Sequence, residues 1–455
     1  MCKTAFLNTL GVCDQWVETT LKKIGEGNVL APDLRGRHKN RPQRWARAII
    51  DGIKTHIESF PRVHSHYTRA RSKREYLETG LSIQRMYRFY KQRAAELAQR
   101  VGSFRLYRRI FNQNYNLGFF LPKKDQCEVC NRWKTAKDRR ERLAMLQEYN
   151  IHLRQRKAIK TLKKNDKDSA GAKKCVACFD LQKVLICPRS DTSVLFYRNK
   201  LSIFNLTIFE LAPKIGHAFV WNETEAKKGS NEIGTCLFNF IEKKVEQEAC
   251  TDFVFYSDSP TGQNRNRMVF SVYLMASAKF QINITHRFLE SGHSYTEADS
   301  MHARIEREAL HKSLYSQAEW VAHIKNAKQE GEMYKVNIVR NQDVMDLKYL
   351  VNRQCWDKDV HGKTVRWTQV REISCRFTEP NQVFLRYDFN EVPKKLIISM
   401  KDKSELDMLN FVPPKAYSKR FPLSEEKVQD LKWLCEKRAI PTNYHSFYDE
   451  LFQIQ

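Results

Sequence analysis

The order of strand-like and helix-like segments between residues 175 and 315 constrains the fold more than any other feature of the sequence. Three strand-like segments come first, and two further strands then alternate with helices. An antiparallel strand unit joined to parallel βα units buries such elements in one sheet, with helices on both faces. The order therefore predicts an α/β fold with a mixed sheet. The predicted strands are 175–185, 195–197 with 202–209, 217–221, 251–256 and 282–286, and the predicted helices are 230–246, 268–280 and 295–312.

Acidic residues occur on these segments where the side chains of such a sheet converge. Asp180 lies on the first predicted strand, and Asp258 follows the fourth, at the carboxyl end of a parallel strand. On the last helix Asp299, His302 and Glu306 are spaced i, i+3 and i+7 and share one face. Enzymes that cut polynucleotides hold two divalent cations ~3.5–4 Å apart with carboxylates. The elements and acids together are those of an RNase H-like fold, and oxygen ligands favour Mg²⁺ or Mn²⁺ as the cofactor.

The third carboxylate of the predicted site has three candidates. Asp299 and Glu306 lie on the last helix, and Glu232 lies on the first helix, where RNase H itself has a Glu. Asp299 is preferred because it begins its helix close to the strand ends, whereas Glu306 lies two turns, ~10 Å, further along the axis. A single Asp at a strand end is usually a cap or turn residue, so the hypothesis depends on the acids occurring together.

A large excess of positive charge indicates a polyanionic partner. The chain has 79 Lys and Arg residues against 52 Asp and Glu residues, a formal net charge of +27 and a pI near 9.6. Nucleic acid is the commonest partner of such a chain, because neutralising phosphates releases counterions, although ribosomal, chromatin and membrane-surface proteins can be equally basic. We expect double-stranded DNA as the partner. An irregular basic strip is expected to contact its phosphates through Arg35, Arg37, Lys39, Arg41, Arg44 and Arg47.

The first 24 residues have the spacing of a helix-turn-helix. An apolar helix around Phe6 meets a turn at Gly11, and a second helix carries Trp16 and exposes Lys22 and Lys23 toward DNA. A plain helical hairpin is the alternative interpretation. Further along, residues 44–120 are predicted to be helical, with Arg interleaved among Tyr and Phe. Aromatic residues at helical spacing favour a core over base stacking for most of these rings.

Two Cys-x-x-Cys pairs predict a structural zinc site. Cys127 and Cys130 follow a loop, as the paired ligands of a zinc knuckle do. The second pair, Cys175 and Cys178, would complete a four-cysteine site. The other arrangement combines Cys127 and Cys130 with His152 on the following helix and one further ligand. Reduced, buried thiols are the alternative to both arrangements.

The sequence contains no evident signal for crossing a membrane. The N-terminus lacks the features of a signal peptide, and the longest apolar run, 268–278, is too short to span a bilayer. Reduced cysteines and short basic clusters favour the nucleus. We expect five regions: a helix-turn-helix-like segment (1–30), a basic all-α DNA-contact region (31–120), a zinc-binding segment and helix (121–174), an RNase H-like catalytic core (175–325) and a small α/β C-terminal appendage (326–455).

Several motifs resemble those of a group of mostly uncharacterised, transposon-derived proteins abundant in arthropods. They are DLQKVL, YSDSPTGQNRN, GHSYTEADSMHARIER and, upstream, PKKDQCEVC. The resemblance covers nearly the whole chain, and the group is similar in its core to DDE/D transposases. It implies that Asp180 of DLQ, Asp258 of YSD and Asp299 of the GHS segment form a catalytic triad. The chain departs from the group at residues 259–261, Ser-Pro-Thr, where the group has an Asn and a Cys.

Two classes of function follow from these residues and the resemblance. The first is a DNA transposase-like polynucleotidyl transferase, which nicks and joins DNA with two divalent metal ions and acts as a homo-oligomer on DNA. The alternative is a domesticated, catalytically inactive DNA-binding protein. A nuclease without strand transfer is compatible with the fold alone. The positions of Asp180, Asp258 and one helix acid discriminate between the first two, because an active site requires them to converge.

Overall fold

The chain divides into two units by its internal contacts. Its structure, a computed structural model, describes residues 2–24, 45–62, 74–78, 81–119, 127–402 and 407–454. Unit 1 comprises Met1–Glu58 and Ser82–Asn116, and unit 2 comprises Ser59–Leu81 and Leu117–Gln455. The candidate acids and the candidate metal-ligating cysteines all lie in unit 2.

Unit 1 is helical in its described residues. Helices α3, α4 and α5 pack on one another through apolar faces, and Phe89, Tyr90 and Tyr107 are buried between them. The Tyr107 hydroxyl lies 2.9 Å from Nδ1 of the buried His56. The interpretation of the interleaved aromatic residues as core is therefore confirmed for these three rings. The helices of unit 1 are α1 (Lys3–Leu10), α2 (Asp14–Lys22), α3 (Arg47–Glu58), α4 (Ile83–Glu96) and α5 (Phe104–Asn114).

The predicted pair of N-terminal helices is present as α1 and α2. Gly11 between them has a φ of 63°, a left-handed conformation that glycine adopts without steric cost. Neither helix buries a residue, and Phe6, Leu10 and Trp16 are exposed. The two helices thus form the expected hairpin without a core of their own among the described residues. Contact of this hairpin with DNA stays a prediction.

Unit 2 is built on a mixed sheet of ten strands, counted over its described residues, in the order β13-β12-β11-β8-β7-β3-β5-β6-β9 with β4 beside β5. β3, β5 and β6 are antiparallel neighbours, whereas β7 and β8 run parallel to β3. The predicted α/β class with a mixed sheet is therefore confirmed. The strands are β3 (Lys174–Leu181), β4 (Leu185–Cys187), β5 (Leu201–Glu210), β6 (Gly216–Asn222), β7 (Asp252–Ser257), β8 (Asn283–Phe288), β9 (Lys335–Ile338), β11 (Glu372–Cys375), β12 (Gln382–Arg386) and β13 (Lys394–Ile397).

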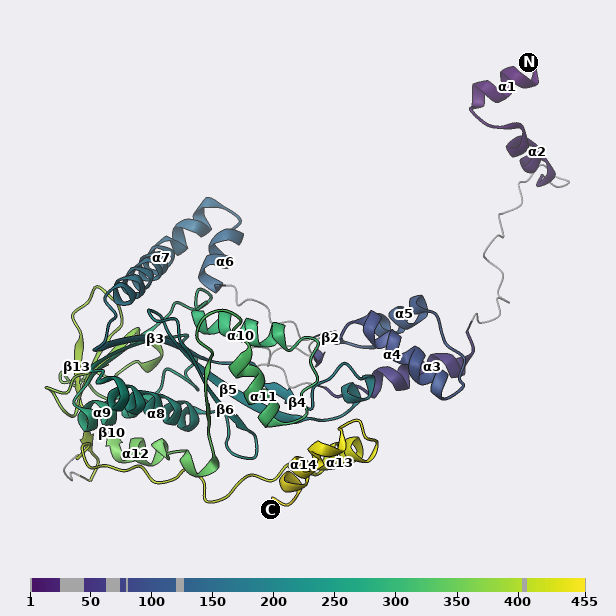
Figure 1. Cartoon of the computed structure of the whole chain (residues 1–455). Helices are drawn as coiled ribbons and strands as arrows, with labels where there is room; N and C mark the ends of the chain where they lie inside the picture. Colours follow the sequence, from purple (N-terminus) through teal and green to yellow (C-terminus); the bar gives the residue numbers. More distant parts are fainter. Residues whose placement is uncertain are drawn as a thin grey trace. The chain divides into compact units, whose positions relative to one another are not determined.

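Helices cover both faces of this sheet, as the sequence predicts (Figure 1). Side chains alternate along each strand, so the odd-numbered residues 175–179 of β3 pack beneath α8 and α9, and Val176 and Cys178 pack on the other face against α7 and α10. The helices on the first face are α8 (Ser230–Glu248), α9 (Arg267–Phe280) and α12 (Leu347–Arg353). Those on the second are α7 (Arg139–Asp168), α10 (Glu297–Glu308), α11 (Gln317–Asn326), α13 (Glu425–Glu436) and α14 (His445–Phe452).

Smaller elements complete unit 2. They are α6 (Glu128–Thr135), the parallel pair β1 (Glu75–Leu77) and β2 (Leu117–Phe119), the antiparallel pair β10 (Gln354–Cys355) and β14 (Ser399–Met400), and 3₁₀ turns at Ser193–Tyr197, Asn341–Asp343, Trp367–Gln369 and Thr442–Tyr444.

Three expectations about this unit differ from the structure. Residues 195–197, expected in a strand, belong to a 3₁₀ turn, because a short apolar run fills a core equally well in either conformation. The first strand ends at Leu181, before β4 begins at Leu185. Residues 326–455, expected as a small appendage, contribute β9 to one edge of the central sheet and β11–β13 to the other.

Candidate functional site

Three acidic residues lie at the carboxyl end of the central strands. Asp180 is near the end of β3, Asp258 directly follows β7, and Asp299 lies in the first turn of α10, which packs against β3. β3 and β7 are parallel neighbours with Cys178 opposite Tyr256, so the same register extended by two residues brings Asp180 beside Asp258. The ligand atoms of Asp180, Asp299 and His302 lie within 4.8 Å of one another.

This site concentrates negative charge around Asp180. Burial, and then the charges of Asp258 and Asp299, raise the pKa of the Asp180 carboxyl well above its usual range. The backbone N–H of Leu181 donates a 2.9 Å hydrogen bond to Asp180 Oδ1 and partly opposes this shift. The Asp180 side chain is nevertheless 27% exposed, so an ion or a substrate from solvent can reach it. Three carboxylates of this kind are an oxygen donor set that suits a hard divalent cation.

Neighbouring side chains hold the other two acids. Asn264, which is buried, donates a 2.7 Å hydrogen bond from Nδ2 to Asp258 Oδ1. Asn266 of the same GQNRN motif caps α9 by accepting hydrogen bonds from the backbone N–H groups of its first turn. Asp299 Oδ2 accepts from both the backbone N–H and the hydroxyl of Thr296, at 2.7 and 3.0 Å. Residues of these motifs therefore orient the carboxylates, and they also cap the N-termini of α9 and α10.

The structure brings Asp299, and not Glu306, to Asp180. Glu306 lies beyond the group formed by Asp180, Asp299 and His302, and its Oε1 accepts a 3.4 Å hydrogen bond from Gln182. Gln182 is oriented in turn by a 2.8 Å hydrogen bond from Asn205. The positional argument for Asp299 over Glu306 thus agrees with the observed geometry.

Glu232 has a different place from the one expected for a catalytic acid. Its Oε2 accepts a 2.8 Å hydrogen bond from the backbone N–H of Gly229, and its Oε1 accepts one from the Tyr417 hydroxyl. The side chain is buried at the N-terminus of α8 as part of a capping box. Both carboxylate oxygens are engaged in holding this helix end, so Glu232 is corrected from a candidate ligand to a structural cap.

His302 joins the acids, one turn along α10 from Asp299. Its ring is buried, Nδ1 lies 3.8 Å from Asp180 Oδ2, and burial lowers its pKa to about 3. No hydrogen-bond partner of Nε2 is present among the described residues. The i, i+3 spacing from Asp299 is the sequence signal that placed it on this face.

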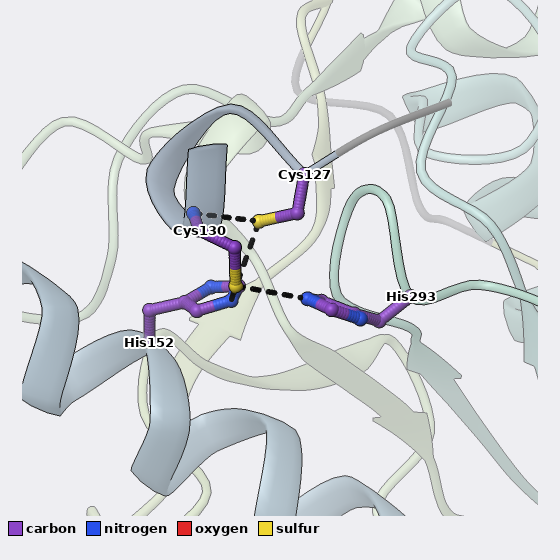
Figure 2. Close-up of side chains that lie close together, drawn as sticks. All are labelled: Cys127, Cys130, His152 and His293. Carbon is purple, nitrogen blue, oxygen red and sulfur yellow. Dashed lines mark hydrogen bonds between the residues drawn. The ribbon is translucent and has the colours of Figure 1, made fainter. Parts of the chain in front are cut away.

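A second group, well defined in its donor atoms, is formed by Cys127, Cys130, His152 and His293 (Figure 2). One ligand atom from each of the four lies within 4.8 Å of the others. His152 Nε2 lies 3.3 Å from both cysteine sulfurs, and His293 Nε2 lies 3.3 Å from Cys130 Sγ. Cys127 is the N-cap residue of α6 and Cys130 lies in its first turn, His152 is on α7, and His293 lies between β8 and α10.

Of the two arrangements expected for the cysteines, the structure assembles the one with His152. Cys175 and Cys178 lie on β3, three residues apart, so their side chains point to opposite faces of the sheet. Cys175 Sγ lies 3.9 Å from Glu210, and Cys178 Sγ lies 3.6 Å from Glu297. The four-cysteine arrangement is therefore wrong. His293, which sequence reasoning missed, is more than 140 positions from His152, and its GHS motif was its only signal.

The candidate DNA-contacting residues are described only in part. Lys22 is exposed and Lys23 half-buried at the end of α2, and Arg47 is exposed at the start of α3. The rest of the basic strip, namely Arg35, Arg37, Lys39, Arg41 and Arg44, lies outside the described residues. Within the described ranges, no helix combines the length and the apolar character needed to cross a membrane.

Comparison with known families places part of this site in a recognised domain. No curated protein matches the chain. Residues 231–374, from α8 to β11, match a family described as a domain of unknown function (DUF8701). The match includes Asp258, Asp299, His302 and His293, and it begins after Asp180 and after the other three members of the cysteine and histidine group.

Proposed function

We propose that this protein is a DNA transposase-like polynucleotidyl transferase that cuts and joins double-stranded DNA with two divalent metal ions. The observation that carries the proposal is that Asp180, Asp258 and Asp299 lie at one end of the sheet, each from a different element. Ligand atoms of Asp180 and Asp299 lie within 4.8 Å of each other, and the charge of Asp258, which follows the neighbouring strand, raises the pKa of Asp180. Carboxylates this close together repel one another unless cations neutralise them.

The strand order supports an RNase H-like fold for this sheet. Its centre runs β6-β5-β3-β7-β8, in which β3, β5 and β6 form an antiparallel unit and β7 and β8 run parallel to β3. An antiparallel unit joined to parallel strands is what the segments 175–315 led us to expect, and β3, which carries the first acid, lies in the middle of this order. Acids from a central strand, its parallel neighbour and the last helix match the placement implied by the resemblance to DDE/D transposases.

The chain's own residues would prepare the site for this chemistry. Asp180, Asp258 and Asp299 would hold Mg²⁺ or Mn²⁺ through their oxygens, with the Leu181 N–H, Asn264 and Thr296 fixing the three carboxylates. When bound, such ions activate a water or a 3′ hydroxyl as the nucleophile and stabilise the leaving 3′ oxygen. Orientation by hydrogen bonds means that the carboxylates need little rearrangement to bind cations.

The charge of the chain supports nucleic acid as the substrate. An excess of 27 positive charges would attract the phosphates that the acidic site would otherwise repel. Binding to transposon ends as a homo-oligomer and action in the nucleus are parts of the same proposal. The alternative is a DNA-binding protein that has lost catalysis, which the Ser-Pro-Thr sequence at 259–261 favours because it replaces polar Asn and Cys beside Asp258.

Nicking of a supercoiled plasmid by the full chain tests the proposal without knowledge of the element ends. We expect conversion to the open circle in Mn²⁺ or Mg²⁺, none in EDTA, and none with Asp258→Asn at equal DNA binding. Nicking that Asp258→Asn retains would overturn the proposal, and DNA binding without nicking in either metal would leave the inactive DNA-binding protein as the better account.

A further inference from the structure

We infer that Cys127, Cys130, His152 and His293 form a zinc site that fastens the segment between β8 and α10, and thereby positions Asp299. The zinc site itself is independent of the function proposed above. A role for it in positioning Asp299 as a metal ligand rests on that proposed function. The whole site comes from three parts of the chain, α6, α7 and the 289–296 segment (Figure 2).

The number of contacts at each donor atom fits a tetrahedral metal better than a set of hydrogen bonds, and the distances are close to those that a metal requires. Zinc bound at ~2.3 Å by sulfur and ~2.0–2.1 Å by nitrogen separates those two ligand atoms by ~3.6 Å in a tetrahedron. The three sulfur–nitrogen contacts here are each 3.3 Å. His152 Nε2 lies beside two sulfurs, and Cys130 Sγ lies beside two ring nitrogens. A ring nitrogen donates or accepts one hydrogen bond, so hydrogen bonds alone do not account for both sulfurs at His152. Two thiolates with two imidazoles select zinc over Mg²⁺ or Ca²⁺.

A carboxylate behind one of the histidines completes the geometry of the zinc site. Glu290 Oε1 lies 3.2 Å from His152 Nδ1, so it orients the ring with Nε2 toward the sulfurs. Glu290 is itself paired with Arg371. The backbone N–H of His293 donates a 2.9 Å hydrogen bond to the Glu290 carbonyl. The 289–296 segment therefore supplies both a ligand and the group that orients another.

Gly292 shows that this segment is built to approach Cys127 closely. Its φ is 75°, and a Cβ at this position would lie 2.4 Å from both Cα and N of Cys127. Only glycine tolerates that distance and that backbone conformation. The close approach brings His293 beside the two sulfurs, and it is an observation independent of the ligand side chains.

The described residues around α6 provide little apolar core that would hold this helix without a metal. α6 has eight residues and buries none of them, and the first half of α7 exposes Leu143, Leu146 and Ile151. The rings of Trp133 on α6 and Tyr149 on α7 stack with their centroids 4.3 Å apart. This contact joins the two helices to each other and not to the sheet. A helix this short is not stable alone in water. A zinc ion bound by both helices supplies the missing stability, as in other small metal-dependent segments.

The 289–296 segment connects Asp258 and Asp299, two of the three acids of the proposed active site. Its first residue, Leu289, donates to the Ser257 carbonyl at 2.9 Å and accepts from the Ser259 hydroxyl at 3.0 Å, on either side of Asp258. Its last residue, Thr296, holds Asp299. His293 lies between these two ends, so fixing it to zinc restricts where α10 begins. Loss of zinc is expected to loosen Asp299 while Asp180 on β3 stays in place.

Metal analysis of the purified full chain tests the zinc site. We expect about one zinc per chain, and replacement by Co²⁺ should give the intense visible absorption of a tetrahedral thiolate site. Cys130→Ser and His293→Gln should lower zinc affinity at least ~10-fold, whereas the exposed Cys355→Ser should not change it. Glu290→Gln, which spares all four ligands, provides a milder variant if a ligand variant fails to fold. A wild-type chain without zinc, or unchanged zinc in Cys130→Ser, would overturn the inference.

Hydrogen exchange of residues 289–299 tests the link to Asp299. Chelation of zinc or His293→Gln should raise exchange in this segment at least several-fold and leave β3 unchanged; unaltered exchange there would reject the positioning role. The two proposals can fail separately. Asp180→Asn should keep its zinc, so a zinc-loaded chain that never nicks DNA rejects only the proposed function. A zinc-free chain that nicks DNA in Mn²⁺ rejects only the zinc site.

Discussion

Asn264 and Asp258 are joined by a 2.7 Å hydrogen bond at the carboxyl end of β7, and the amide that makes it is buried. The bond connects a residue of the GQNRN motif to an acid of the proposed active site. Because a buried amide has no solvent to replace this partner, its position determines the orientation of the carboxylate.

Asn264→Ala should therefore reduce nicking without removing a metal ligand. We expect kcat to fall by ~10–100-fold and half-maximal activation to require more Mn²⁺, since a freely rotating Asp258 binds cations less well. Steady-state nicking rates over a Mn²⁺ titration measure both quantities. Gln263→Ala in the same loop is the control and should behave as wild type. Equal kinetics for the two variants would contradict a positioning role for Asn264.

Substitution of each acid should distinguish the carboxylates that bind the metal ions from a carboxylate that only lies nearby. Asp180→Asn, Asp258→Asn and Asp299→Asn should each abolish detectable nicking, because an amide of the same shape cannot neutralise a cation. DNA affinity should stay the same or rise slightly, since each change removes a charge that repels phosphate. Glu306→Gln should retain most activity, because its carboxylate lies outside the group of Asp180, Asp299 and His302 and accepts a 3.4 Å hydrogen bond from Gln182. Nicking assays measure the activity of each variant, and gel-shift titrations measure its DNA affinity. A Glu306→Gln variant as inactive as Asp299→Asn would contradict the choice of Asp299 over Glu306 as the third metal ligand.

Buried His286 should make the protein less stable in mild acid. Its ring bonds with the Ser257 hydroxyl at 2.9 Å and the Tyr273 hydroxyl at 3.1 Å, and burial lowers its pKa to about 3. Below the unfolded-state pKa of ~6.5 the unfolded chain binds a proton that the folded chain does not, so stability falls with pH by up to ~1.4 kcal/mol per unit from 6.5 toward 3. Urea unfolding between pH 7 and 4.5 should show a shallower decline for His286→Gln. The exposed His311→Gln is the control, with the wild-type slope.

The net charge of +27 predicts a steep dependence of DNA binding on salt. The logarithm of the affinity for a random duplex should fall with the logarithm of the salt concentration with a slope of several units, ~0.9 for each phosphate neutralised. Changing the six basic residues of the strip 35–47 to Ala should reduce this slope and weaken specific and random DNA alike. Fluorescence anisotropy at several salt concentrations measures the slope. A flat response would remove the basis for a nucleic-acid partner.

Local pattern in the sequence was sufficient for the central elements and for two of the acids. Strand and helix periodicity is set by neighbouring residues, so the strands that carry Asp180 and precede Asp258 could be placed without a structure. The same holds for Cys127 and Cys130, whose spacing within one turn already brings their sulfurs together. Net charge, which is a sum over residues, needed no fold at all.

Only the tertiary structure decided which distant side chains meet. Glu232 and Asp299 both stand at the N-terminus of a helix, but packing of Tyr417 on Glu232 makes the first a buried cap, while the position of α10 brings the second to Asp180. The pairing of His152 with His293 depends on how α7 and the 289–296 segment cross, and no local pattern encodes that crossing. Periodicity specifies the face on which a residue lies; the partner it meets there is determined by long-range packing.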